Sequence, residues 1–240
     1  LFQAVEPWER RVTSSTPEQL EAAAPSATDL EQQAGGRAHT YLVGVAHRPL
    51  KEKAAALPVP FQTPFGPALP DLPALQALDA FLPFELFNTP LAFREEHSLE
   101  LPLFFLKGRF PEARVLPLLV ARRSPELGEA LKVVLRDFPG LLVLAVDLSH
   151  VGPRFGDTPL TRTLAEEARR RDLGFLERLA EGEPEAALAF LGANPTRIDG
   201  VEVVASLLPL LRERKGKVLA HRLDLEAPTL SAVGAGTLVL

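Results

Sequence analysis

Short runs of apolar residues, each bounded by turn residues, recur along the chain. Runs of this length and near-continuous apolar character are typical of strands that are covered on both faces. Four of them are predicted to be strands: residues 40–46, 115–120, 141–146 and 217–225. A last segment, residues 229–240, alternates around Gly234 and Gly236 and predicts a terminal strand or hairpin.

Helical patterns lie between these runs. A serine or threonine followed by proline supplies an N-cap and a first-turn proline, and this pair predicts helices over residues 124–137 and 158–181. Apolar positions at helical spacing predict a third helix over residues 199–214. Residues 57–90 are rich in proline, show little periodicity and are predicted to form a long surface excursion. Strands that alternate with helices predict an α/β layered sheet in a single domain over residues 1–240.

Composition narrows the function classes. The chain has no cysteine, which excludes disulfides, a zinc ribbon and a thiolate nucleophile, so any site must use oxygen and nitrogen. A net charge of -5 argues against nucleic acid and favours small molecules or proteins as partners. There is no apolar run long enough to cross a membrane and no signal-peptide pattern, so the cytoplasm is the predicted location. The arginine and proline content, with no Cys or Met, is consistent with a heat-adapted source.

Three candidate ligands follow two of the predicted strands. His47 comes directly after the first strand, and Asp147 and His150 come after the strand over residues 141–146. If these strands are neighbours, the three side chains converge on one crevice outside the carboxyl ends of the sheet. Two imidazoles and a carboxylate suit non-haem Fe(II), zinc or another divalent ion. Asp199 is a fourth candidate ligand, although a carboxylate at a helix start is commonly a cap.

Structural explanations compete with each of these assignments. A histidine after a strand is more often a hydrogen-bonded loop residue than a ligand, and Asp147 has the position of a turn cap. His97 is equally explained as a helix-entry residue beside an N-cap at Ser98. His39 and His221 have no acidic or histidine neighbour at ligand spacing, so no role is predicted for them. The sequence contains no GxGxxG, GxxxxGK[ST], GxSxG or HExxH motif.

Six segments in order resemble the Memo family, also called AmmeMemoRadiSam system protein B. They are LVGVAH at 42–47, FQTPFG at 61–66, EEHSLELP at 95–102, FPEARVLPLLV at 110–120, LAVDLSHVGPRF at 144–155 and SAVGAG at 231–236. The resemblance implies a fold like that of class III extradiol ring-cleaving dioxygenases. Such a fold has a parallel-rich mixed sheet flanked by helices on both faces.

The resemblance also implies a metal-capable crevice. His47 matches the family's second ligand histidine, and Asp147 and His150 match a flanking pair. The region around residues 12–16 lacks the family's first ligand histidine, and Asp199 stands where the family has a ligand cysteine. Aspartate in place of cysteine favours harder metals, so we expect a divalent metal, with Fe(II) favoured and Mn or Zn as alternatives.

Two functions remain open at this point. The first is a metal-dependent, dioxygenase-like oxidoreductase of unknown reaction, with metal ligands His47, His150, Asp147 and Asp199. Its catalytic groups would be His150, Asp147 and His97, the last orienting a carboxylate such as Asp147. The second is a catalytically silent binding or adaptor protein that has lost the family's metal site. A small molecule or peptide would occupy the crevice, and the resemblance implies a possible radical-SAM enzyme system as partner.

Overall fold

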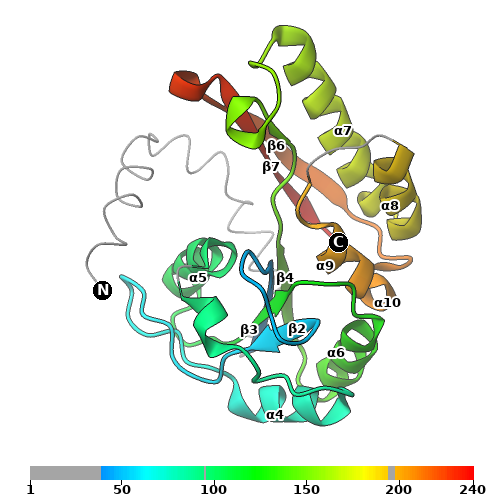
Figure 1. Ribbon diagram of the computed structural model, residues 1–240. Helices are drawn as coiled ribbons and strands as arrows, with labels where there is room; N and C mark the ends of the chain where they lie inside the picture. The colour runs from blue at the N-terminus through cyan, green and yellow to red at the C-terminus, as the bar shows by residue number, and fades with distance from the viewer. Residues whose placement is uncertain (1–38, 95, 194–197) are drawn as a thin grey trace.

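The computed structural model describes residues 39–94, 96–193 and 198–240. Its central sheet has four strands in the order β2 (Ala54–Ala56), β3 (Arg114–Val120), β1 (His39–Val45) and β4 (Gly140–Ala145). Strands β3, β1 and β4 are parallel, whereas β2 runs antiparallel to β3 at one edge (Figure 1). The predicted α/β fold with a parallel-rich mixed sheet is therefore confirmed, and the three parallel strands lie within one residue of their predicted boundaries.

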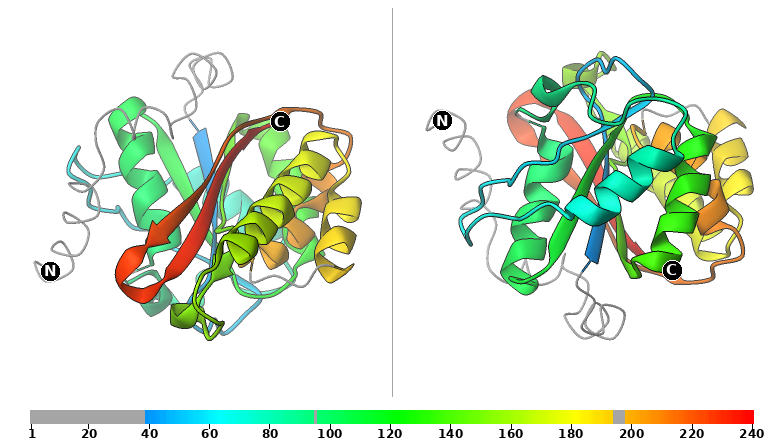
Figure 2. Two further views of the ribbon diagram at one scale, coloured as in Figure 1. Left: turned by 90° about the horizontal axis from the view of Figure 1, so that it is seen from above. Right: turned by 90° about the horizontal axis from the view of Figure 1, so that it is seen from below.

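Helices cover both faces of this sheet, as the two opposite views in Figure 2 show. Alternate residues of a strand point to opposite faces. In β1, Leu42 packs with α5 (His97–Arg109), whereas Tyr41 and Val43 belong to the larger core on the other face. Six of the described helices contribute to that larger core: α4 (Leu72–Phe81), α6 (Pro125–Asp137), α7 (Arg162–Ala180), α8 (Pro184–Ala193), α9 (Val201–Ser206) and α10 (Leu208–Leu211). The sheet is thus anchored on both sides and gives a fixed base to the loops at its ends.

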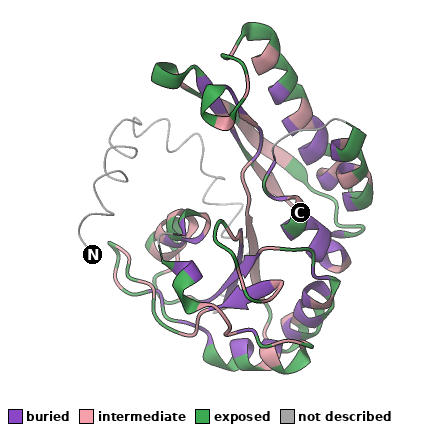
Figure 3. Cartoon of the chain, viewed as in Figure 1, coloured by how far each residue is buried: buried purple, intermediate pink, exposed green. Residues whose placement is uncertain are grey.

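A second sheet of three antiparallel strands lies beside the first. Its order is β5 (His150–Val151), β7 (Ser231–Val239) and β6 (Lys217–Glu226). Helix α7 (Arg162–Ala180) packs against β6 and β7, and α8 (Pro184–Ala193) packs on α7. The prediction that β6 is covered on both faces is wrong, because none of its ten residues, all of them described, is fully buried (Figure 3). Strand β6 lies at the edge of its sheet, which leaves several of its side chains exposed to solvent.

The proline-rich residues 57–90 are not an irregular excursion throughout, because they contain α4. Asp71 caps this helix by accepting a hydrogen bond from the Ala74 N–H at 3.4 Å. Pro73 lies in the first turn, where a missing N–H costs no intrahelical hydrogen bond. The helix then buries Leu75 against the core. The abundance of proline therefore concealed a helix that uses one proline at a favourable position.

Two other helices differ from the predictions at their boundaries. Helix α7 begins four residues later than predicted, because the Thr161 hydroxyl caps it by accepting the Leu164 N–H at 3.2 Å. The helix predicted over residues 199–214 is two short helices, α9 and α10, which are separated at Leu207. Pro209 follows two residues later and has no N–H to continue the first helix.

Short 3-10 turns connect several of these elements: η1 (Pro90–Phe93), η2 (Pro153–Phe155) and η3 (Ala227–Thr229). Of these, η2 follows β5 almost directly and includes Arg154 and Phe155. In the described part of the chain, every helix is too short or too polar to cross a bilayer.

Candidate functional site

The candidate functional residues lie where the central strands end. Strands β1 and β4 are parallel neighbours, so their carboxyl ends meet at the same edge of the sheet. His47 follows β1 by two residues, and Asp147 follows β4 by two residues. A cavity of about 370 Å³ opens at this edge. Seven of the described residues line it: His47, His97, Asp147, His150, Arg154, Phe155 and Asp199. The structure thus brings together all the residues predicted as metal ligands or catalytic groups.

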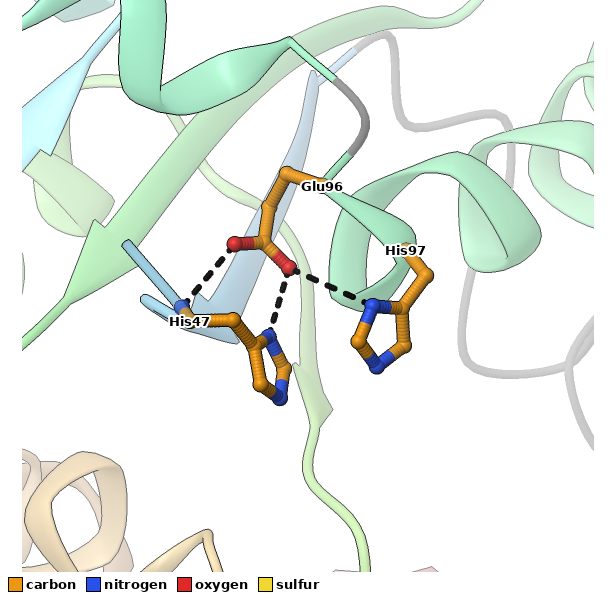
Figure 4. A group of neighbouring side chains, drawn as sticks. All are labelled: His47, Glu96 and His97. Carbon is orange, nitrogen blue, oxygen red and sulfur yellow. Dashed lines mark hydrogen bonds and ion pairs between the residues drawn. The ribbon is translucent and has the colours of Figure 1, made fainter. Parts of the chain in front are cut away.

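The ring of His47 is oriented by the buried carboxylate of Glu96 (Figure 4). The Nδ1–H of His47 donates to Glu96 Oε1 at 2.7 Å, and its backbone N–H donates to Glu96 Oε2 at 3.0 Å. Glu96 Oε1 also accepts the Ser98 N–H at 3.2 Å, and only 2% of Glu96 is exposed. Because an ionised carboxylate only accepts, Nδ1 of His47 carries the hydrogen and Nε2 is left to face the cavity.

Helix α5 begins close to β1 because Gly44 has no side chain. A Cβ atom at Gly44 would lie 2.4 Å from Ser98 Oγ, which donates a hydrogen bond to the Val45 carbonyl at 2.9 Å. The prediction that Ser98 is the N-cap is therefore wrong. Glu96 is the N-cap, and His97 is the first helical residue. Glu96 thus caps helix α5 and also orients His47, which follows the neighbouring strand β1.

His97 lies beside His47 at the mouth of the cavity. The two imidazole centroids are 4.1 Å apart and the ring planes are tilted by 31°. His97 Nδ1 lies 4.0 Å from Glu96 Oε1, and 53% of the His97 side chain is exposed. His97 is therefore the most accessible of the histidines that line the cavity.

His150 is oriented by a backbone carbonyl. Its Nδ1–H donates to the Leu148 carbonyl at 2.9 Å, so Nε2 is directed to the cavity, 3.5 Å from Asp147 Oδ2. Phe155 packs edge-on against the His150 ring, with centroids 4.8 Å apart. Ser149 is completely buried on the opposite side of the segment, as the alternation of an extended chain predicts. Ser149 is therefore not a nucleophile for His150.

Carboxylates on both sides of His47 favour its protonated form. Its Nε2 lies 3.8 Å from Asp199 Oδ2, and the side chains of Asp199 and then Glu96 raise the pKa of His47 to about 10 against an opposing effect of burial. Burial pushes the pKa of Glu96 upward. The hydrogen bonds from His47 and Ser98 outweigh that effect and hold the pKa of Glu96 below its ordinary value. His47 without a metal ion is thus an imidazolium between two carboxylates.

Asp147 is stabilised in its ionised form. The side chain of His150, whose Nε2 lies 3.5 Å from Asp147 Oδ2, lowers the pKa of Asp147 despite burial, and the charges of His97 and His47 contribute in the same direction. The carboxylate is therefore ionised at neutral pH. Together with Asp199, it gives the cavity two carboxylates, each with an oxygen within 4.8 Å of the other and of a ring nitrogen of His47.

Within the described part of the chain, two groups of side chains have ligand atoms close enough to hold one ion. In the first group, the ligand atoms of His47, Asp147 and Asp199 all lie within 4.8 Å of one another. The second group consists of His47, Glu96 and His97. In that second group the carboxylate already accepts hydrogen bonds from three N–H donors, so it serves as support. His150 belongs to neither group but contacts Asp147 from the side of the cavity.

The sequence did not reveal the partners of several histidines. Glu96 is prominent only as part of the segment that resembles the Memo family. His39 pairs with the buried Asp71, and His221 Nε2 lies 2.9 Å from Asp172 Oδ2. These partners are 32 and 49 residues apart in sequence, so no local spacing signals them.

The sequence also matches known proteins over most of its length. Residues 21–239 match the family model described as Memo-like protein. The chain belongs to the Memo-like family. A MEMO1 family protein of Aquifex aeolicus (strain VF5) is 32% identical to it over 208 residues, which cover 82% of this chain and 54% of that protein. A MEMO1 family protein of Thermotoga maritima is 29% identical over 146 residues, which cover 58% of this chain and 48% of that protein.

The resemblance to the Memo family is thereby confirmed. The chain spans about half the length of the curated relatives it matches. The segment around residues 12–16, where the resemblance implies the family's first ligand histidine, lies outside the described residues. Asp199, which the resemblance aligns with a ligand cysteine of the family, lines the cavity. The side chains that line the cavity of this Memo-like chain therefore offer nitrogen and oxygen donors and no sulfur donor.

Proposed function

We propose that this Memo-like chain binds a divalent metal ion in the cavity and acts as an oxidoreductase similar to non-haem iron dioxygenases. His47, Asp147 and Asp199 would hold the ion, with His150 as the second imidazole. Imidazole and carboxylate donors are the set found in non-haem Fe(II) sites, so Fe(II) is favoured and Mn or Zn is an alternative. When bound, the ion would supply a Lewis acid and a redox centre.

The support of the two imidazoles carries this proposal. The Nδ1–H of His47 is bonded to a buried carboxylate and that of His150 to a backbone carbonyl. A metal-binding histidine usually donates its other ring N–H in this way, which fixes the tautomer and directs the remaining nitrogen to the ion. The nearby carboxylates of Asp147 and Asp199 supply negative charge that a divalent cation would neutralise.

The other lining residues would bind and orient the substrate. The Arg154 guanidinium lies 5.6 Å from the Phe155 ring centroid and pairs with Glu226 at 3.1 Å. An anionic group of a small molecule or peptide would replace Glu226 as the partner of Arg154. The exposed ring of His97 is within reach of a ligand beside His47 and would exchange a proton with it.

Titration of metal-free protein tests this proposal. Protein treated with a chelator would be titrated calorimetrically with Mn²⁺ and Zn²⁺, and with Fe²⁺ in the absence of oxygen. We expect one ion per chain, and affinity at least about 10-fold weaker in His47→Ala and Asp199→Ala. The matched control is His39→Ala, because the His39 side chain is 26% exposed and pairs with a buried carboxylate, much as His47 does. Equal affinities in all variants would contradict the proposal.

A second function is favoured by the charge on His47. With a pKa raised to about 10, the imidazolium between Asp199 and Glu96 neutralises carboxylate charge without a metal ion. The cavity would then bind a small molecule or peptide as part of an adaptor that performs no chemistry. This function predicts that the wild-type chain takes up less than one ion per chain in the same titration. It also predicts that His47→Ala leaves the activity of any bound partner protein unchanged.

A further inference from the structure

A buried polar network lies beneath the segment that carries Asp147 and His150. Its members are Ser149 after β4, Asp172 on α7 and His221 on β6. Ser149 and Asp172 are completely buried, and only 3% of the His221 side chain is exposed. None of the three lines the cavity. Buried polar groups are costly unless they are paired, so an arrangement of this kind calls for a specific role.

Asp172 binds Ser149 through two hydrogen bonds. Asp172 Oδ1 accepts the Ser149 N–H at 3.0 Å and the Ser149 hydroxyl at 2.6 Å, and Oδ2 faces His221 Nε2 at 2.9 Å. The carboxylate also lies against Gly234 of β7, where a Cβ atom would be only 2.1 Å from Oδ2. Gly234 in turn donates its N–H to the Ser149 carbonyl at 2.7 Å. Three elements therefore fix the position of one serine.

His221 leaves one buried ring nitrogen unsatisfied. Its Nδ1 has no hydrogen-bond partner among the described residues. If Nε2 carries the hydrogen and donates it to Asp172, the unpaired Nδ1 has only a lone pair. In the opposite tautomer, Nδ1–H would be a buried donor without an acceptor, which costs more free energy. We therefore assign the hydrogen to Nε2. Asp172 then accepts three hydrogen bonds, which compensate for the burial of its carboxylate.

The network reaches the cavity through the backbone on either side of Ser149. The residue before Ser149 is Leu148, whose carbonyl accepts the Nδ1–H of His150 at 2.9 Å. The residue after Ser149 is His150 itself. We propose that Asp172 and His221 are positioning residues that hold this segment so that His150 Nε2 is directed into the cavity. The expected effect of this orientation of His150 Nε2 on metal binding rests on the proposed function. The orientation itself is a property of the metal-free chain.

Nitrogen NMR of the full chain tests the orientation directly. At a pH where the rings are neutral, the ¹⁵N shifts of His150 report which ring nitrogen carries the hydrogen, and we expect Nδ1–H in the wild type. Asp172→Ala should give a mixture of tautomers and faster hydrogen exchange at the Ser149 amide. Asp172→Asn keeps an oxygen acceptor for Ser149, and its amide N–H₂ can donate to His221 Nε2 once the ring hydrogen moves to Nδ1, so both signals should recover even though the chain loses stability. Zinc affinity should fall about 10-fold or more in Asp172→Ala and recover in Asp172→Asn.

Matched variants separate positioning from general loss of stability. Tyr41→Phe removes a buried hydroxyl that donates to the Phe138 carbonyl at 2.6 Å, at the opposite end of β1, and should leave His150 unchanged. Gly234→Ala should reproduce Asp172→Ala, because its methyl group displaces the carboxylate. Gly192→Ala is its control, since a Cβ atom there would meet nothing within 4 Å.

The outcomes distinguish this proposal from the proposed function. A His150 tautomer and a Ser149 exchange rate that are the same in Asp172→Ala and Tyr41→Phe would overturn the positioning role. If Asp172→Ala does not fold, Ser149→Ala removes one of the two hydrogen bonds and should shift both signals in the same direction by less. A wild-type chain that binds no zinc would refute the metal site alone, because the NMR signals still decide the positioning role.

Discussion

Raising the pH should destabilise the metal-free chain through His47. The carboxylates of Asp199 and Glu96 raise the pKa of His47 from an ordinary value of 6.5 to about 10 in the folded state. Between these two values the folded chain binds a proton at His47 that the unfolded chain has released. The stabilisation is therefore complete below pH 6.5 and is lost as the pH rises through about 10.

The size of this effect follows from the pKa of His47. Each tenfold change in proton affinity is worth about 1.4 kcal/mol, so a rise from 6.5 to about 10 sets an upper bound of about 5 kcal/mol. The side chains of His47 and Asp199 are 30% and 41% exposed, so solvent screens their attraction. We therefore expect His47 to account for about 2 kcal/mol of the free energy of unfolding.

Urea unfolding in the presence of a chelator measures the contribution of His47. The free energy of unfolding would be obtained by circular dichroism at several pH values from about 6 to about 10.5 for wild type and His47→Gln. The difference between the two chains should be largest at low pH and shrink by about 2 kcal/mol across this range. Gly192→Ala, where a Cβ atom would meet nothing within 4 Å, is the control and should keep the wild-type slope between pH 7 and about 10.

A difference between wild type and His47→Gln that stays constant from low to high pH would refute the reasoning. It would mean that His47 titrates near its ordinary pKa in the folded chain. The Asp199 carboxylate would then have to lie farther from the ring than 3.8 Å in solution.

Three substitutions test the parts of the site separately. Glu96→Gln places an amide N–H₂ against N–H donors, so it should lower the free energy of urea unfolding by about 2–4 kcal/mol. A loss below about 0.5 kcal/mol would show that the pair of Glu96 and His47 contributes little to stability. Gly44→Ala brings a methyl group to 2.4 Å from Ser98 Oγ and should cost about 1–3 kcal/mol in thermal unfolding, whereas an unchanged melting temperature would mean that α5 shifts freely. Asp199→Cys should raise the affinity for Zn²⁺ relative to Mn²⁺ by about 10-fold in a competition titration, and an unchanged ratio would argue that residue 199 is not a ligand.

The central sheet was predictable because its strands are marked by composition. Parallel strands that are covered by helices are rich in aliphatic residues, and β3 and β4 follow this rule. Helix α4 was not predicted in the same way, because prolines dominate its neighbourhood and conceal the favourable N-cap at Asp71. The burial of β6 depends on where its sheet ends, which the sequence of the strand does not encode.

The convergence of the site was predictable, but its support was not. His47 and Asp147 follow strands that are parallel neighbours, and topology alone then places them at one edge of the sheet. The pairing of Asp172 with His221 depends instead on how α7 packs against β6, across 49 residues of sequence. Chemical groups at strand ends can thus be inferred from local patterns, whereas the groups that hold them require the tertiary structure.

His47 Nε2 binds either a proton or a metal ion, and the same carboxylate favours both. Asp199 raises the pKa of His47 and is also a candidate ligand for the ion. Metal binding must therefore displace a proton, and its apparent affinity should fall about tenfold for each pH unit below the pKa of His47. Cysteine at position 199 would couple the two equilibria differently, because a thiol must itself lose a proton before it binds a metal. The presence of aspartate at this position means that pH and metal concentration together decide whether the cavity holds an ion or an imidazolium pair.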